Sequence, residues 1–142
     1  GTHGRFTLIE LLLVIGIVVV LGAIVLVIMS PNDQLKEAYN IQRRQDIGGI
    51  LNSVYKYGID NKGKLPDLPA TATEICRSQP DSDCKGFVDL SMLRGKYLST
   101  IPADPEEATK HSTKYTIYRD PSNAVVTVSA PQAQNEVISV SQ

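Results

Sequence analysis

The sequence has no tryptophan, few aromatic residues and no excess of either charge. Aromatic residues make up 6% of the chain, and 14 Lys and Arg oppose 15 Asp and Glu, which gives a net charge of -1. The basic residues are scattered, so no basic stretch is present that would follow a phosphate backbone, and nucleic-acid binding is not indicated. With so few aromatic residues, the core of any folded part has to rest mainly on Ile, Leu and Val.

The chain is also poor in the residues that build active sites. Its two histidines, His3 and His111, are isolated in the sequence, and no Ser/His/Asp set, Cys/His set or phosphate-binding glycine loop is present. We therefore expect neither an enzyme nor a bound cofactor or metal.

Two acidic groups could in principle bind calcium: Asp81 with Asp83, and Asp104 with Glu106 and Glu107. Neither group has the spacing of an EF-hand loop. We interpret both as solvated charges on loops.

Cysteine occurs only twice, as Cys76 and Cys84 on either side of RSQPDSD. That spacing is too long for a zinc-knuckle pair, and the histidines complete no ligand set. Two cysteines that close a short polar loop predict a disulfide in an oxidising compartment, which contributes about 2–3 kcal/mol in the chain-entropy model. The alternative is a pair of free thiols in a cytosolic protein.

The longest feature is an apolar run from Leu11 to Met29 without a charged or strongly polar side chain. A helix of about 20 residues spans the hydrocarbon of a bilayer, so the run predicts a membrane span. It is too long for the apolar region of a cleaved secretory signal. Arg5 precedes the run and the net-negative segment 33–37 follows it, which places the amino end in the cytoplasm and the rest outside.

Glu10 lies just before this apolar run. A carboxylate there is costly in a membrane unless a cation compensates it. The surrounding stretch RFTLIELLLVIGI resembles the class III signal of type IV pilins and type II secretion pseudopilins. In that family a Gly precedes the cleavage point, an aromatic residue begins the mature chain, and Glu is its fifth residue. Residues 6–10 match this pattern position by position.

The resemblance implies a processing region at Gly4, Arg5 and Phe6, and an assembly role for Phe6 and Glu10. A prepilin peptidase would cut after the Gly and methylate the new amino terminus, which pairs with Glu10 of a neighbouring copy. The chain departs from the family at Arg5, which stands between the Gly and the aromatic residue. We expect that Arg5 of a neighbouring copy could itself supply the cation for Glu10.

The end of the apolar run predicts a hinge near residues 29–32. Pro31 either kinks the helix or begins a new one, with Ser30 as its N-cap. Gly16 and Gly22 are the weak points inside the run, and a helix that loses turns on assembly would lose them there.

An amphipathic helix is predicted over residues 33–58, and residues 43–46 are predicted to form a polar turn within it. One side carries apolar residues at the helical period. These residues are Tyr39, Ile47, Ile50, Leu51, Val54 and Tyr57.

The remainder predicts a long connecting region and a small sheet. Residues 59–112 are rich in Pro, Asp, Ser and Gly, with a short helix near Asp89–Tyr97. Three strands are expected after it, and DPSN forms a tight turn between the first two. The predicted strands are Tyr115–Arg119, Ala124–Ala130 and Val137–Val140.

These patterns predict an α+β fold in which a long N-terminal helix packs on a three-stranded antiparallel sheet. The expected divisions are a processing region at 1–5, an apolar membrane and filament-core helix at 6–31, and a head at 32–142 with its sheet at 113–142. By resemblance the chain is a structural subunit of a type IV pilus-like filament. It would be a single-pass membrane protein before assembly and part of an extracellular helical homopolymer afterwards. Its partners would be other copies, the prepilin peptidase and the assembly machinery.

Two alternatives stay open at this point. One is a pseudopilin of a type II secretion system. The other is a monomeric single-span protein with a ligand-binding ectodomain, in which Glu10 would have no partner.

Overall fold

A computed structural model describes residues 7–28, 31–134 and 136–142. The chain divides into two compact units, Gly1–Lys36 and Glu37–Gln142, and each is described by itself. The predicted processing residues Gly4, Arg5 and Phe6 lie outside the described residues, as do residues 29–30 of the predicted hinge.

Helix α1 runs over Leu8–Ile28 and falls inside the predicted apolar segment 6–31. Among the described residues, no helix combines the length and the apolar character needed to cross a membrane. The membrane span predicted from the sequence is therefore not confirmed.

Helix α2 runs over Pro31–Asp60 and extends the predicted helix 33–58 at both ends. Pro31 opens the helix, a position where its fixed φ is favourable and its missing N–H leaves no bond unmade. The helix ends where Lys62 (φ 59°) and Gly63 (φ 85°) take left-handed conformations and Gly63 N–H donates to Gly58 O at 2.7 Å.

The apolar face predicted on α2 is confirmed at its centre. Ile47, Ile50, Leu51 and Val54 are buried, while Tyr39 and Tyr57 are partly buried. Within the predicted polar turn, Arg44 and Gln45 are exposed, whereas Arg43 and Asp46 are buried.

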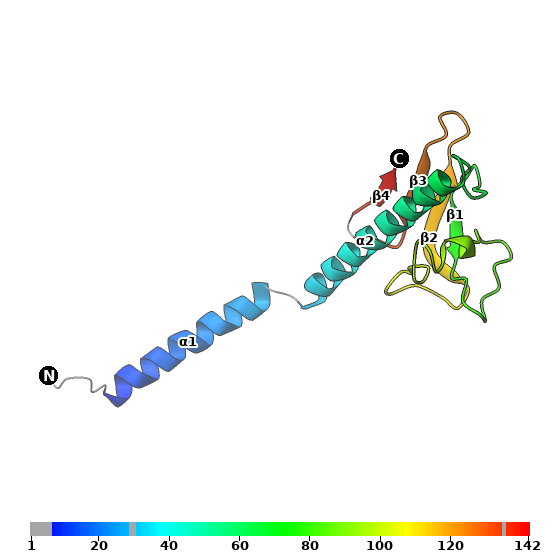
Figure 1. The fold of residues 1–142 in the computed structure, drawn as a ribbon. Coiled ribbons are helices and arrows are strands. Elements are labelled where there is room, and N and C mark those ends of the chain that lie inside the picture. Colours follow the sequence, from blue (N-terminus) through cyan, green and yellow to red (C-terminus); the bar gives the residue numbers. More distant parts are fainter. Residues whose placement is uncertain (1–6, 29–30, 135) are drawn as a thin grey trace. The chain divides into compact units, whose positions relative to one another are not determined.

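A four-stranded antiparallel sheet, in the order β1-β2-β3-β4, packs against α2 (Figure 1). The prediction of three strands is wrong. The sheet comprises β1 (Thr73–Cys76), β2 (Ser112–Arg119), β3 (Val126–Ala130) and β4 (Ile138–Ser141).

The strand missed by prediction is β1, which lies inside the predicted connecting region 59–112. It has only four residues, and its partly buried and buried positions do not alternate as in a half-buried strand. Its stability comes from pairing with β2, far along the chain, and that pairing leaves no local signal. The short helix predicted near Asp89–Tyr97 is reduced to one 3-10 turn over Ser91–Leu93.

The hairpin predicted around DPSN is confirmed between β2 and β3. Asp120 closes it, because its N–H donates to Val125 O at 2.9 Å and its carboxylate accepts the N–H of Ser122 at 2.8 Å. Ala124 (φ 61°) makes the left-handed step back into β3.

The core lies between α2 and the inner face of the sheet. Tyr115, Ile117, Val126 and Val128 of the sheet are fully buried against it. This core rests largely on branched aliphatic residues, as the low aromatic content predicts.

A buried ion pair crosses this core. Arg43 is fully buried and donates through Nε and one terminal nitrogen to both oxygens of Asp104, at 2.8 and 3.0 Å. It also donates to Glu106 at 3.1 Å and to the amide oxygen of Asn40 at 2.9 Å. Asn40 in turn donates to Gln134 O at 2.7 Å, so one guanidinium links α2 to the 104–106 loop and to the segment before β4.

A second buried carboxylate lies one turn along α2. Asp46 accepts the Tyr115 hydroxyl at 2.6 Å and the Gln42 amide at 2.8 Å. Burial raises the pKa of Asp46, and these two bonds only partly offset it.

We expect Arg43→Met to lower the free energy of unfolding by about 3–5 kcal/mol, because it leaves the buried Asp104 carboxylate without its cation. The control is Arg44→Met, since Arg44 pairs with Glu136 while 48% exposed and its loss should cost less than about 1 kcal/mol. Urea unfolding of the full chain, followed by tyrosine near-UV circular dichroism, measures both. Equal losses for the two variants would contradict the role given to the buried pair.

Candidate functional site

The surface of α1 carries the strongest functional signal in the described chain. Every side chain from Leu8 to Ile24 is exposed, including Leu8 at 74% and Ile9 at 77%. Apolar residues occupy the whole circumference of this helix, whereas a helix on a soluble domain is apolar along one stripe. An apolar surface of this kind marks a place where other molecules pack.

Glu10 is the one charged residue of α1 and lies in its first turn. Its backbone N–H donates to the Thr7 hydroxyl at 3.2 Å, so Thr7 caps the helix. The Thr-x-x-Glu spacing is that of a capping box, and an acidic side chain in the first turn also interacts favourably with the helix dipole. This capping role was not predicted from the sequence, although the Thr-x-x-Glu spacing alone indicates it.

The cap leaves the Glu10 carboxylate exposed. It can accept hydrogen bonds from a cation that another molecule brings to this end of the helix. The bond to Thr7 uses only the backbone N–H of Glu10, so the carboxylate stays available for the predicted assembly role.

Gly16 and Gly22, predicted as hinge positions, lie inside a continuous α1. A Cβ at either position would meet no atom within 4 Å. Gly16 lines a shallow apolar groove of about 430 Å³ along one side of the helix, with Leu12, Leu13, Ile17, Val20 and Leu21. The proposed loss of helical turns on assembly stays a prediction.

The disulfide between Cys76 and Cys84 is confirmed, with Cα atoms 5.3 Å apart. The loop that it closes is held against the segment before β2. Ser82 donates to Lys110 O at 2.8 Å, and the N–H of Asp83 donates to Nδ1 of His111 at 2.8 Å. His111 therefore supports this loop, while His3 lies outside the described residues.

The interpretation of Asp104 as a solvated loop charge is wrong. Burial alone would raise the pKa of Asp104, but hydrogen bonds from Arg43 and from the N–H groups of Glu106 and Glu107 hold it below its usual range. Asp81 is exposed and lies 3.8 Å from Lys110. In the described part of the chain, no three His, Cys, Asp or Glu side chains form a group that could hold a metal ion.

No protein-family model, curated protein or solved structure matches this chain. The resemblance to pilins therefore stays a prediction from the sequence. The described chain combines the apolar surface of α1, the exposed Glu10 and a disulfide-bonded head.

Proposed function

We propose that this chain is a structural subunit of a type IV pilus-like filament, assembled by packing α1 of many copies together. The observation that carries the proposal is the exposure of apolar side chains around the whole of α1, with the Glu10 carboxylate among them at one end. A single partner would cover one side of such a helix. A bundle of copies covers all of it.

The energetics favour a bundle over an isolated helix in water. Full burial of a large apolar side chain contributes about 1.5–3 kcal/mol, and α1 exposes such side chains along its length. A copy held in lipid has already left water, so its transfer into the bundle is driven by helix–helix packing instead. Glu10 adds selectivity, because its burial is acceptable only where a neighbour supplies a cation.

The sequence resemblance supplies the remaining parts of the proposal. Before assembly a copy would be held in the membrane with its amino end in the cytoplasm, and a prepilin peptidase would process it near Gly4 to Phe6. Each copy would then offer one part of α1 to the copy below and another part to the copy above. Such a head-to-tail contact does not close and propagates as a fibre.

Imaging of sheared cell-surface material tests the proposal. We expect thin fibres under negative stain, built from a subunit whose mass gives the mature amino terminus. Absence of fibres, together with failed protein export in a deletion strain, would replace the pilus by the secretion pseudopilus. Absence of both would remove the filament proposal altogether.

Glu10→Gln should abolish fibre formation or reduce it at least tenfold, because the neutral amide no longer attracts the neighbouring cation. The matched control is Glu37→Gln, which removes an exposed carboxylate from α2. Quantitative immunoblots of sheared and cell-bound fractions measure both variants. A Glu10→Gln chain that assembles as well as the control would support the monomeric alternative.

Arg5→Gln separates the two cations available to Glu10. If Arg5 of a neighbouring copy compensates the carboxylate, this variant should lose fibres to the same extent as Glu10→Gln. Unchanged assembly of Arg5→Gln would instead leave the processed amino terminus as the partner. The same sheared-fraction assay gives the answer, with subunit mass as a check on processing.

A further inference from the structure

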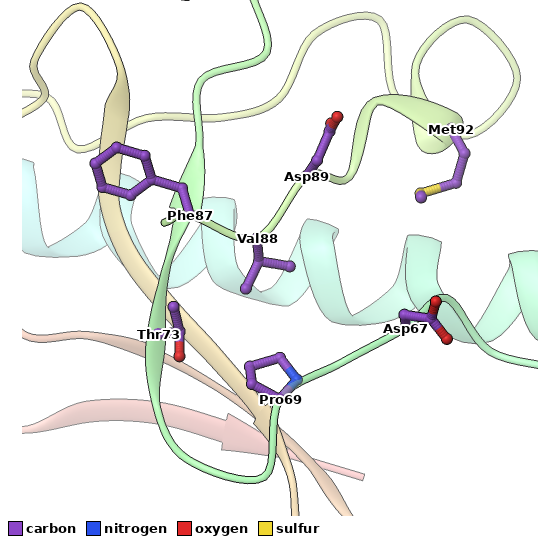
Figure 2. A pocket seen from close by; sticks show the side chains of 7 residues that line it. All are labelled: Asp67, Pro69, Thr73, Phe87, Val88, Asp89 and Met92. Carbon is purple, nitrogen blue, oxygen red and sulfur yellow. The ribbon is translucent and has the colours of Figure 1, made fainter. Parts of the chain in front are cut away.

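The loop that the Cys76–Cys84 disulfide closes has a fixed base. Cys76 ends β1, and its N–H donates to the carbonyl of Val88 at 2.8 Å. The N–H of Val88 in turn donates to Glu74 O at 2.9 Å. Figure 2 shows Val88 together with Thr73, the residue that begins β1. The chain on both sides of this loop is therefore attached to the edge of the sheet.

The tip of the loop, residues 79–83, is held by fewer contacts. It lies against the segment 109–111, which precedes β2. Ser82 donates to Lys110 O at 2.8 Å, and the N–H of Asp83 donates to Nδ1 of His111 at 2.8 Å. The side chains of Asp81 and Lys110 are 3.8 Å apart, but they are 65% and 60% exposed, so this ion pair contributes little. Among the described residues, two hydrogen bonds therefore hold the tip to this segment.

The segment that carries His111 is itself fixed. The carbonyl of His111 accepts the N–H of Arg77 at 2.8 Å, next to the pairing of β1 with β2. The N–H of Thr109 donates to Ser112 O at 2.9 Å, and the N–H of Ser112 donates to the Thr109 hydroxyl at 3.0 Å. The half-buried imidazole is therefore presented to the loop by ordered backbone. If the contact is lost, the tip is the side that moves.

The bond from Asp83 requires a neutral imidazole. Nδ1 can accept an N–H only while it carries no proton of its own, and in the imidazolium both ring nitrogens are donors. A rotation of the ring therefore cannot restore an acceptor for the Asp83 N–H. Histidine is the side chain that ordinarily gains its proton between about pH 8 and pH 5. The bond from Ser82 joins a hydroxyl to a carbonyl and does not depend on pH in this range.

The charged groups around this contact are of both signs. One oxygen of the Asp83 carboxylate already accepts the N–H of Lys85 at 3.0 Å. An imidazolium that paired with this carboxylate would therefore require the tip to rearrange. The charged side chains on the segments that meet here are Arg77, Asp81, Asp83 and Lys85 on and next to the loop, Lys110 beside His111, and the pair of Glu74 with Lys114 on the strands.

We propose that protonation of His111 releases the tip of the disulfide loop, residues 79–83, from the segment before β2. The disulfide and the pairing of Val88 with β1 keep the base of the loop in place. The head therefore has one loop whose conformation responds to mild acid. The inference goes beyond the proposed filament and does not rest on it, because every group involved belongs to the second unit.

Hydrogen exchange of the full chain in detergent, read by peptide mass spectrometry, tests the release. The parent is compared with His111→Asn at pH 7.5 and at pH 5.0, since the intrinsic exchange rate cancels between two chains at one pH. The asparagine amide oxygen can accept the Asp83 N–H and gains no proton. We expect equal exchange of residues 79–85 at pH 7.5. At pH 5.0 the parent should exchange about three- to tenfold faster, as expected for the loss of one hydrogen bond.

The change of the ratio with pH decides the outcome. If the amide does not reach Asp83, the variant exchanges faster at pH 7.5 and the two chains converge at pH 5.0, which supports the same release. A ratio of the two exchange rates that is equal at both pH values overturns the proposal. Residues 126–130 of β3 should exchange equally in both chains and show that the fold is retained.

Asp81→Asn is the matched control. It removes the carboxylate nearest to Lys110 and leaves the imidazole of His111 in place. This variant should keep the full acid response of the parent. An acid response that is lost in Asp81→Asn but kept in His111→Asn would assign the response to Asp81 and overturn the proposal.

Discussion

The apolar circumference of α1 is the constraint on which the proposed function depends. A helix with one apolar stripe can bury that stripe against its own domain. A helix that is apolar on every side has no polar face to leave in water. Exposed apolar surface of this extent is what motivates the proposal that other copies cover it. The head, by contrast, buries its own apolar residues between α2 and the sheet and leaves a mainly polar exterior.

The head combines an aliphatic core with a buried polar network. Branched aliphatic side chains fill most of its core, and such cores tolerate several similar packings. The Arg43–Asp104 pair, with Asn40 and Glu106, joins α2 to the 104–106 loop inside this core. Replacing both partners of such a pair by apolar residues is often neutral in stability, whereas removing one partner alone leaves an uncompensated buried charge.

Local patterns predicted the local parts of this fold. The apolar period of α2, the DPSN turn and the two cysteines around a polar loop each carry their signal within a few residues, and all three are confirmed. Strand β1 and the burial of Arg43 depend on partners far along the chain, which no local pattern identifies. The capping role of Thr7 was within reach of the sequence, because its spacing to Glu10 is local. The assembly roles of Phe6 and Glu10 stay predictions.

The bonds that fix α2 also set an order for making the head. Asp104 follows Arg43 by 61 residues, Tyr115 follows Asp46 by 69, and Gln134 follows Asn40 by 94. During synthesis α2 emerges first, but Asp104 and Tyr115, the distant partners of its buried Arg43 and Asp46, follow 61 and 69 residues later. Long-range contacts of this kind slow folding, because the chain entropy of closing the loop is lost before the contact forms. The head therefore cannot complete the bonds that hold α2 until Gln134, close to its last strand, has been made.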